Sequence, residues 1–291
     1  MTSKKICILD KALPLNEEFY IKLISNLNAQ NINISYCRRP NEDSRNADII
    51  VLSAPMNTKI FSVDQIVLGL RTINRKERML IADKFMSPKF MARWASPESD
   101  EELKETLTAW NTDEYIFKYD SSAGRRGVAL IDQKTGQIPE DYSSEKDVIM
   151  EYLKDDPYTY KADMFCGVLL NTWFLRTTDI SHEEFNNYTS NPTNFELPED
   201  IKGELEELSR ELMKYGSGYI SIDLMKCDGH YKIIEINTNS VGRNISWKHF
   251  SEDYLLTYPV GIRKLLESYS IAPTFENLKK KFRTNEWMKS I

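Results

Sequence analysis

The sequence has no long run of apolar side chains. A helix that crosses a membrane needs roughly 20 consecutive apolar residues, and no segment of the 291 residues approaches this length. The N-terminal segment MTSKKICILD lacks the apolar stretch and cleavage site of a signal peptide and is typical of a first β-strand. We therefore expect a soluble, cytoplasmic protein without a membrane partner.

Positive charge is not in excess either. The 38 basic residues are outnumbered by 44 acidic residues, and the net charge is −6. A protein that binds nucleic acid broadly needs a basic surface that this balance does not indicate, so we expect no nucleic-acid partner. The basic cluster at 279–283 (KKKFR) is interpreted as the solvated face of a helix, in preference to a partner site.

Cysteine and histidine are scarce. The four cysteines are far apart, lack the spacing of a zinc site, and are interpreted as buried, reduced thiols. The three histidines lie in a polar loop, in a turn and before a helix, without a serine or cysteine partner pattern, so histidine-based catalysis is not expected. These residues are Cys7, Cys37, Cys166, Cys227, His182, His230 and His249.

Short apolar runs alternate with amphipathic segments along the first part of the chain. This alternation is typical of a small α/β unit with a parallel sheet. Strands are predicted at 4–10, 33–37 and 47–54, and helices at 15–30 and 62–75.

The remainder of the chain has more strand-like runs, which favours a mixed α/β (α+β) fold. Helices are predicted at 83–94, 99–110, 198–215 and 251–269, and a polar loop at 181–197. Strands are predicted at 114–119, 128–131, 148–153, 159–167 and 169–178, with a hairpin from residue 218.

Acidic and amide groups lie inside the two apolar runs of this hairpin, which flank Cys227-Asp-Gly-His230. Glu235 and Asn237 are two residues apart and therefore share one face of their strand. If the loop is the three-residue segment 228–230, Asp223 lies opposite Glu235, with Cβ atoms roughly 5 Å apart. A two-residue turn would instead place these two acids on opposite faces.

Two carboxylates at that spacing repel each other, and their burial requires a counterion. Carboxylate and amide oxygens suit a hard cation such as Mg²⁺, which usually also binds phosphate oxygens. The sequence therefore predicts a Mg²⁺ site at Asp223, Glu235 and Asn237.

A glycine-containing segment follows Lys118. The chain has only 11 glycines, and two of them, Gly124 and Gly127, lie within four residues. A loop of this kind can bring backbone N–H groups close to phosphate oxygens, and Lys118, Arg125 and Arg126 would add positive charge. It is not a P-loop, which requires Gly-Lys-Ser/Thr at the start of a helix. The alternative is a surface hairpin with exposed arginines.

The predicted strand at 148–153 (VIMEYL) precedes a group of acidic residues. Its apolar side chains could cover a flat base, its backbone could contact the base edge, and Asp155 or Asp156 could accept hydrogen bonds from ribose hydroxyls. An ordinary core strand is an equal alternative for this segment taken alone. Together with phosphate donors and metal ligands, it indicates a nucleotide–magnesium site.

These elements, in this order, resemble the ATP-grasp superfamily, in particular its ribosomal-protein-glutamate-ligase-like and glutathione-synthetase-like branch. The resemblance extends from about residue 80 to residue 267. It implies an ATP-grasp fold preceded by a small α/β domain. The implied domains are an N-terminal domain at 1–82, a subdomain with a glycine-rich lid loop at 83–153, and a C-terminal subdomain with the metal site at 154–291.

The resemblance also implies roles for individual residues. Arg176 would face the transferred phosphate, and Arg243 would hold a substrate carboxylate, with a structural ion pair as the alternative for Arg243. The implied nucleotide-binding residues are Lys84, Lys118, Ser121, Gly124, Gly127, Glu151, Tyr152, Leu153 and Asp156. The implied metal ligands are Asp223, Glu235 and Asn237.

Two departures from the family pattern concern the substrate. Tyr160-Lys-Ala-Asp163 lacks the arginine of an Asp-x-Arg found in the closest relatives, and residues 181–197 lack the basic residues often found there. ATP and Mg²⁺ binding are not affected by these departures.

The chemistry implied by the resemblance is transfer of the γ-phosphoryl group of ATP to a carboxylate, followed by attack of an amine on the acyl phosphate. One or two Mg²⁺ ions would assist, with Mn²⁺ as an alternative. The substrate would be an amino acid, a peptide or a small metabolite, and a homodimer is left open. The alternatives are a kinase that phosphorylates a small-molecule hydroxyl group, as the inositol-phosphate kinases of this superfamily do, and a nucleotide-binding protein without turnover. The kinase ranks lower because the sequence has no strong basic cluster apart from 279–283.

Overall fold

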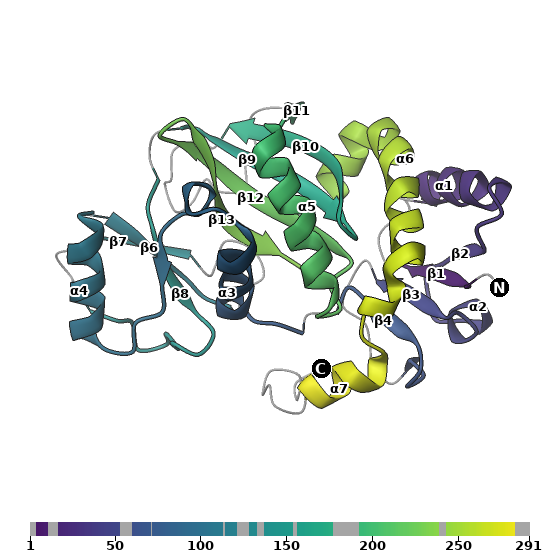
Figure 1. The fold of residues 1–291 in the computed structure, drawn as a ribbon, viewed down its shortest axis with the longest axis horizontal. Coiled ribbons are helices and arrows are strands. Elements are labelled where there is room, and N and C mark those ends of the chain that lie inside the picture. The colour runs from purple at the N-terminus through teal and green to yellow at the C-terminus, as the bar shows by residue number, and fades with distance from the viewer. Residues whose placement is uncertain are drawn as a thin grey trace.

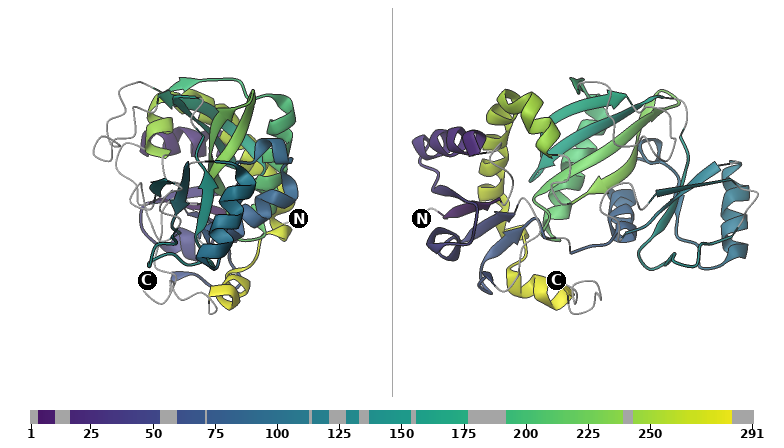
Figure 2. Two further views of the ribbon diagram at one scale, coloured as in Figure 1. Left: turned by 90° about the vertical axis from the view of Figure 1, so that its left-hand side faces the viewer. Right: turned by 180° about the vertical axis from the view of Figure 1, so that it is seen from behind.

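The described part of the chain forms three β-sheets with helices packed against them, which confirms the expected α/β fold class. The computed structural model describes residues 4–10, 17–52, 60–70, 72–112, 114–120, 128–132, 137–153, 156–176, 192–238 and 243–282. The second sheet lies at the centre of an elongated molecule, between the first sheet at one end and the third sheet at the other (Figures 1 and 2).

The first sheet is parallel and consists of four short strands. These are β1 (Ile6–Leu9), β2 (Ile34–Cys37), β3 (Ile49–Leu52) and β4 (Ile66–Leu68). Their order in the sheet is β2-β1-β3-β4. Helix α1 (Glu17–Ala29) connects the first two strands, and the short helix α2 (Glu42–Arg45) precedes the third. The alternation predicted up to residue 54 is thus confirmed.

The predicted helix at 62–75 is wrong, because this segment contains β4. The apolar side chains of Ile66–Leu68 are all buried in the sheet. Gly69 ends the strand with a φ of +96°, and a Cβ at this position would lie 2.4 Å from the carbonyl oxygen of Leu52. Glycine permits both this backbone conformation and the close approach to the neighbouring strand.

Helix α3 (Arg75–Phe85) begins earlier than the helix predicted at 83–94. The Asn74 side-chain oxygen accepts a hydrogen bond from the backbone N–H of Glu77 (2.9 Å), and the Glu77 carboxylate accepts one from the backbone N–H of Asn74 (2.7 Å). This capping box fixes the start of the helix and places Arg75 in its first turn. The prediction of a helix start at 83 is therefore wrong.

The third sheet packs against helix α4 (Asp100–Trp110), which agrees with the helix predicted at 99–110. Its strands are β5 (Trp94–Ala95), β6 (Glu114–Lys118), β7 (Val128–Asp132) and β8 (Val148–Glu151), and a 3₁₀ turn, η3 (Pro88–Phe90), precedes them. The antiparallel order is β5-β8-β6-β7. Tyr115 and Phe117 of β6 pack under α4, so Lys118 points to the opposite side, toward the second sheet.

The second sheet is antiparallel and contains the predicted hairpin. Its strands are β9 (Tyr158–Phe165), β10 (Val168–Arg176), β11 (Thr193–Asn194), β12 (Tyr219–Cys227) and β13 (His230–Asn237). Their order is β11-β10-β9-β12-β13, which makes β13 the edge strand, on the side of the third sheet (Figure 1). Most of the loop predicted at 181–197 lies outside the described residues.

Helices lie on both faces of the second sheet. Helix α5 (Glu199–Met213) covers one face and packs in the same core as Ile222. Helix α6 (Arg243–Ser268) is kinked at Phe250, and its part after the kink agrees with the helix predicted at 251–269. It covers part of the opposite face, where Tyr258 stacks on Phe165 with ring centroids 4.6 Å apart. Within the described part of the chain, none of the helices has the length and apolar character needed to cross a membrane.

The C-terminal end of the described chain returns to the first sheet. After a 3₁₀ turn, η6 (Tyr269–Ile271), helix α7 (Phe275–Phe282) places Phe275 in the core shared with β1 and β3. The Phe275 backbone N–H donates to the carbonyl oxygen of Gln65 (2.8 Å). The predicted boundary between the first two domains, at residues 82 and 83, falls inside helix α3. The predicted domain limits stay a prediction.

The capping box gives a first testable prediction. We expect Asn74→Ala to destabilise the protein by about 1 kcal/mol, because an N-cap side chain typically contributes this much. Urea unfolding monitored by circular dichroism would measure the change. Asn26→Ala, at an exposed asparagine within α1, is the control and should alter stability by less than about 0.5 kcal/mol. Equal stability of Asn74→Ala and the wild type would contradict the assigned cap.

Candidate functional site

The hairpin places Asp223 directly opposite Glu235, as predicted, but by a different route. The turn contains only two residues, 228–229, with φ values of +53° and +77°, so the condition of a three-residue loop is not met. A two-residue turn alone would separate the acids onto opposite faces. One extra residue in β13, Ile234, forms a β-bulge that restores the pairing.

Cross-strand pairing extends the acid pair into a row of four side chains on one face of the second sheet. Trp173 of β10 pairs with Lys161 of β9, and Lys161 pairs with Asp223. Asp223 in turn pairs with Glu235 of β13. The neighbouring row on the same face consists of Asn171, Asp163, Ser221 and Asn237. All three predicted metal ligands therefore lie on one face, in two adjacent rows.

Each acid of the pair has a basic partner. The Lys161 ammonium forms an ion pair with Asp223 Oδ1, and Arg75 Nη2 lies 3.1 Å from Glu235 Oε1. Lys161 comes from the same sheet, whereas Arg75 reaches the acid from the first turn of α3. The side chains of Asp223 and Glu235 are only 15% and 24% exposed. Two partly buried carboxylates are thus compensated by two cations.

Burial and charge shift the pKa values of these groups in different directions. Burial raises the pKa of Asp223, and the charge of Glu235 adds to this effect, although Lys161 opposes it. Burial also opposes ionisation of Glu235, but Arg75 and the other nearby cations lower its pKa to about 2. Burial disfavours the Lys161 cation, yet Asp223 raises the pKa of Lys161 above its ordinary value. Glu235 is therefore ionised at neutral pH.

Lys118 connects the third sheet to the bulge in the second sheet. Its ammonium donates a hydrogen bond to the carbonyl oxygen of Ile234, the residue that the bulge inserts. Lys118 is only 4% exposed. Burial lowers the pKa of Lys118 to about 8, although the charge of Glu235 acts in the opposite direction. Lys118 is therefore a cation that can lose its proton close to neutral pH.

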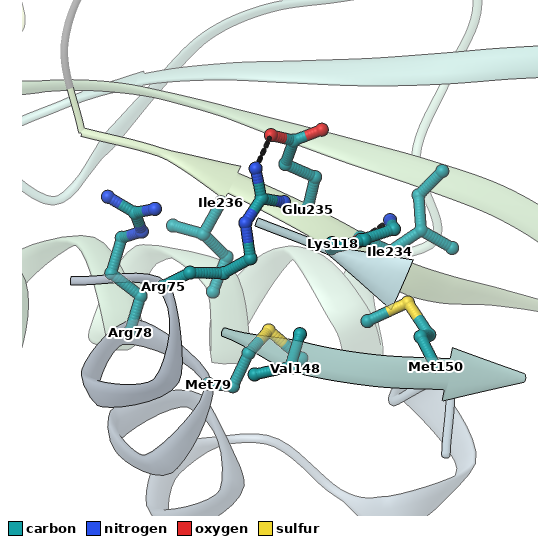
Figure 3. Close-up of a pocket in the computed structure, with 9 residues that line it drawn as sticks. All are labelled: Arg75, Arg78, Met79, Lys118, Val148, Met150, Ile234, Glu235 and Ile236. Atoms are coloured by element: carbon teal, nitrogen blue, oxygen red, sulfur yellow. Dashed lines mark hydrogen bonds and ion pairs between the residues drawn. The ribbon is translucent and has the colours of Figure 1, made fainter. Parts of the chain in front are cut away.

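These groups line a narrow pocket between α3, the third sheet and β13 (Figure 3). Arg75, Arg78 and Lys118 provide three positive charges, and Glu235 provides one negative charge. Arg75 Nε is buried and has no hydrogen-bond partner among the described residues. Asp120, which pairs with Arg78, balances a second of these charges, so one net positive charge and the unused Arg75 donor remain to suit an anionic ligand. The other lining side chains are apolar: Met79, Val148, Met150, Ile234 and Ile236.

A buried carboxylate fixes the start of α3 to the end of β6. Asp120 Oδ1 accepts a hydrogen bond from the backbone N–H of Arg75 (2.7 Å) and lies 3.3 Å from Arg78 Nη2. The Asp120 backbone N–H donates to Asp147 Oδ1 (2.6 Å). Because Asp120 lies two residues after Lys118, this network holds the three cations of the pocket beside one another.

A larger, open cavity of about 450 Å³ lies at the end of β8, beside the hairpin turn. Its lining includes three residues expected to contact adenine, namely Glu151, Tyr152 and Leu153. Arg93 Nε lies 2.6 Å from Glu151 Oε2, and Lys232 Nζ lies 3.6 Å from Glu151 Oε1. Met150 lines the charged pocket and Glu151 lines this cavity, and as consecutive strand residues their side chains face opposite sides of β8.

No protein-family model matches the sequence, and no curated protein matches it either. The fold does have counterparts among solved structures. D-cycloserine synthetase DcsG has a TM-score of 0.59 at 13% identity, over 89% of this chain and 99% of that chain. The ATP-grasp ligase PsnB, complexed with minimal precursor, Mg and ADP, has a TM-score of 0.58 at 11% identity, over 91% and 99% of the two chains. The chain has the ATP-grasp fold. D-alanine–D-alanine ligase from Bacillus anthracis is also similar to this ATP-grasp chain, with a TM-score of 0.50 at 15% identity over 92% and 100% of the two chains.

Three residues to which the ATP-grasp resemblance gave roles lie away from the acid pair. Lys84 is exposed on the last turn of α3, outside both spaces described above. Arg176 is exposed at the end of β10 and pairs with Tyr158, on the sheet face opposite to that of the acid pair. The Asp156 carboxylate accepts hydrogen bonds from the backbone N–H of Tyr158 (3.0 Å) and the hydroxyl of Tyr160 (2.8 Å).

Four further predicted residues lie wholly or partly outside the described structure. Ser121, Gly124 and Gly127 belong to a segment that the structure does not describe, and only the backbone of Arg243 is described, at the start of α6. Their roles stay predictions.

Sequence reasoning missed Arg75, Arg78 and Lys161 as site residues. The capping motif Asn74-x-x-Glu77 could have identified the first two, because it starts α3 at Arg75 and places Arg78 one turn later on the same face. Lys161 could not be found in this way, since its position beside Asp223 depends on the pairing of β9 with β12.

The lowered pKa of Lys118 gives a second prediction, which concerns how the binding of an anionic ligand depends on pH. ADP serves as the anionic ligand in the test. We expect the affinity for ADP to fall as the pH rises through about 8, because the unliganded amine then loses the proton that attracts phosphate. Calorimetric titration from about pH 7 to about pH 9.5 would measure this. Lys118→Arg keeps its charge over this range and should remove the dependence. A wild-type affinity that stays constant across the range would contradict the assignment.

Proposed function

We propose that the protein is an ATP-dependent ligase that joins a carboxylate to an amine through an acyl phosphate. The observation that supports this most directly is the pairing of Asp223 with Glu235 beside a pocket lined by three cations and one carboxylate. The ATP-grasp fold provides the context, since DcsG, PsnB and D-alanine–D-alanine ligase are named as synthetases or ligases.

We assign the charged pocket and the open cavity to different parts of a nucleotide. Arg75, Arg78 and Lys118 would bind phosphate oxygens, with the arginines able to do so in a bidentate manner. The open cavity of about 450 Å³ beside Tyr152 has room for a base and a ribose. Arg75 would then take the phosphate-binding role first expected of Lys84.

The donor groups on the sheet suit Mg²⁺. Asp223, Glu235 and Asn237 offer carboxylate and amide oxygens on one face, where Lys161 and Arg75 now act as counterions. The described residues contain no group of three His, Cys, Asp or Glu side chains that could hold a metal, but here an amide would supply the third ligand. When bound, Mg²⁺ would neutralise phosphate oxygens and the charge that develops during transfer.

The proposed reaction has two steps. A substrate carboxylate oxygen attacks the γ-phosphorus of ATP, ADP leaves, and an acyl phosphate forms. An amine then attacks the acyl carbon and displaces phosphate, with loss of a proton from nitrogen. Both partners of the first step are anions, so the pocket must offset their repulsion. Arg75 and Lys118 are held beside the site by α3 and β6, but the pocket between them does not admit a water molecule and Arg75 is paired with Glu235, so these side chains would have to move apart to admit phosphate.

The substrate class follows less directly from the site. PsnB is complexed with a precursor peptide in one solved structure, and DcsG is named for a small product. A peptide and a free amino acid are therefore both included as substrates in the tests of this proposal.

The proposal predicts a severe loss of turnover in Glu235→Gln. This change preserves the shape of the side chain but removes the charge that pairs with Arg75 and would ligate the metal. We expect ADP release to fall by about 100-fold or more, a typical loss when an electrostatic contribution to a transition state is removed. Glu211→Gln is the matched control, because Glu211 forms an ion pair with Lys214 on α5. ADP release by Glu235→Gln at the wild-type rate would overturn the site assignment.

The same assay identifies the reaction. ADP release is screened with amino acids, peptides and small carboxylic acids, each with and without an amine, and products are analysed by mass spectrometry. A condensed product with loss of water supports the ligase. A stable phosphorylated alcohol would contradict it and favour the kinase alternative.

A further inference from the structure

A third carboxylate, Asp163, lies on the same sheet face as the acid pair, in the neighbouring row. It is 1% exposed. Its Oδ2 accepts a hydrogen bond from the indole Nε1 of Trp173 (2.9 Å) and another from the hydroxyl of Tyr254. A carboxylate with so little solvent access is stable only when its charge is hydrogen-bonded or paired. Neither the proposed metal site nor the proposed nucleotide site uses this group.

The contacts of Asp163 lead directly to the proposed metal site. Trp173, whose N–H is fixed by Asp163, lies under the ammonium of Lys161, with 5.7 Å between Nζ and the ring centroid. Lys161 forms the ion pair with Asp223. Asp163 also stabilises the Lys161 cation through its own negative charge. The ammonium is therefore held by an ion pair on one side and by an aromatic ring and a second carboxylate on the other.

Tyr254 adds α6 to this arrangement. Helix α6 follows the strand of Glu235 and Asn237 along the chain and packs on β10. Its Tyr254 is fully buried and reaches the sheet at Asp163. Tyr254 and Trp173 both donate to Oδ2, so this oxygen of Asp163 is fixed by one donor from α6 and one from β10 of the sheet.

We propose that Asp163 is a positioning residue that holds Lys161, through Trp173 and its own charge, so that Mg²⁺ can take the place of Lys161 on Asp223. The inference rests on the proposed function, because it assumes that Asp223 ligates the metal. Lys161 and Mg²⁺ compete for the same carboxylate. The ring of Trp173 and the charge of Asp163 stabilise the Lys161 ammonium after it leaves Asp223, so its release is less unfavourable. The cation also remains close to the site.

A purely structural role for Asp163 predicts a different result. If its function were only to connect α6 with β10, substitution would lower stability but leave the metal dependence of the folded protein unchanged. If Asp163 instead holds Lys161, removal of its charge leaves the ammonium attracted more exclusively to Asp223. Mg²⁺ then competes less well, and more metal is needed to support nucleotide binding.

The test measures the Mg²⁺ concentration at which ADP affinity is half-maximally enhanced, by calorimetry on the full-length protein. Asp163→Asn keeps the shape of the side chain, and Tyr254→Phe removes one hydrogen bond if the first variant fails to fold. Tyr258→Phe is the matched control, since Tyr258 is an equally buried tyrosine one turn along α6 that stacks on Phe165. Thermal unfolding of each variant records any general loss of stability.

We expect Asp163→Asn to raise this Mg²⁺ concentration by about tenfold, the lower end for loss of a group that orients a metal ligand, and Tyr254→Phe to raise it by less. Tyr258→Phe should leave it at the wild-type value. Equal Mg²⁺ requirements in all folded variants would overturn the inference while leaving the proposed function intact. Absence of any Mg²⁺ effect on ADP binding by the wild type would instead overturn the metal assignment, and the inference with it.

Discussion

Compensation of two adjacent carboxylates is the constraint on which the rest of this site depends. Asp223 and Glu235 face each other across two strands and are mostly buried, so each requires a cation nearby. Lys161 comes from a third strand, whereas Arg75 comes from a helix that lies outside the sheet. The acid pair therefore stabilises a particular placement of α3 against β13. Sheet pairing and helix placement are coupled through charge at this point.

The β-bulge at Ile234 has two effects on the site, one on Glu235 and one on Lys118. It restores the face on which Glu235 lies after a two-residue turn, and its carbonyl oxygen accepts the hydrogen bond from Lys118. A regular strand would not have the first effect, because its alternation would turn Glu235 away. The third sheet thus contacts the second through an irregularity in the edge strand.

Strands and the acid pair could be predicted from the sequence because alternation and residue type determine them locally. The bulge could not, since the two consecutive isoleucines Ile233 and Ile234 fit an ordinary apolar strand as well as they fit an inserted residue. The error at α3 has another origin. The capping motif at Asn74 was visible, but an apolar run around Ile66 also fits a helix when its pairing with β3 is unknown. Arg75 was missed as a consequence of that error.

The energetics of Lys118 indicate why an anion is expected beside it. Its pKa of about 8, against an ordinary value of 10.5, means that the folded protein is destabilised below pH 8 by on the order of 3 kcal/mol relative to an unperturbed lysine. This penalty diminishes as the pH rises from about 8 toward 10.5, because the folded protein then holds the neutral amine and the cost of removing its proton falls to zero at the ordinary pKa. An apolar side chain of similar size would avoid the penalty. Bound phosphate would offset it, by restoring a full counterion to the ammonium. Buried Lys118 therefore lowers the stability of the protein without a ligand and stabilises a complex with an anion.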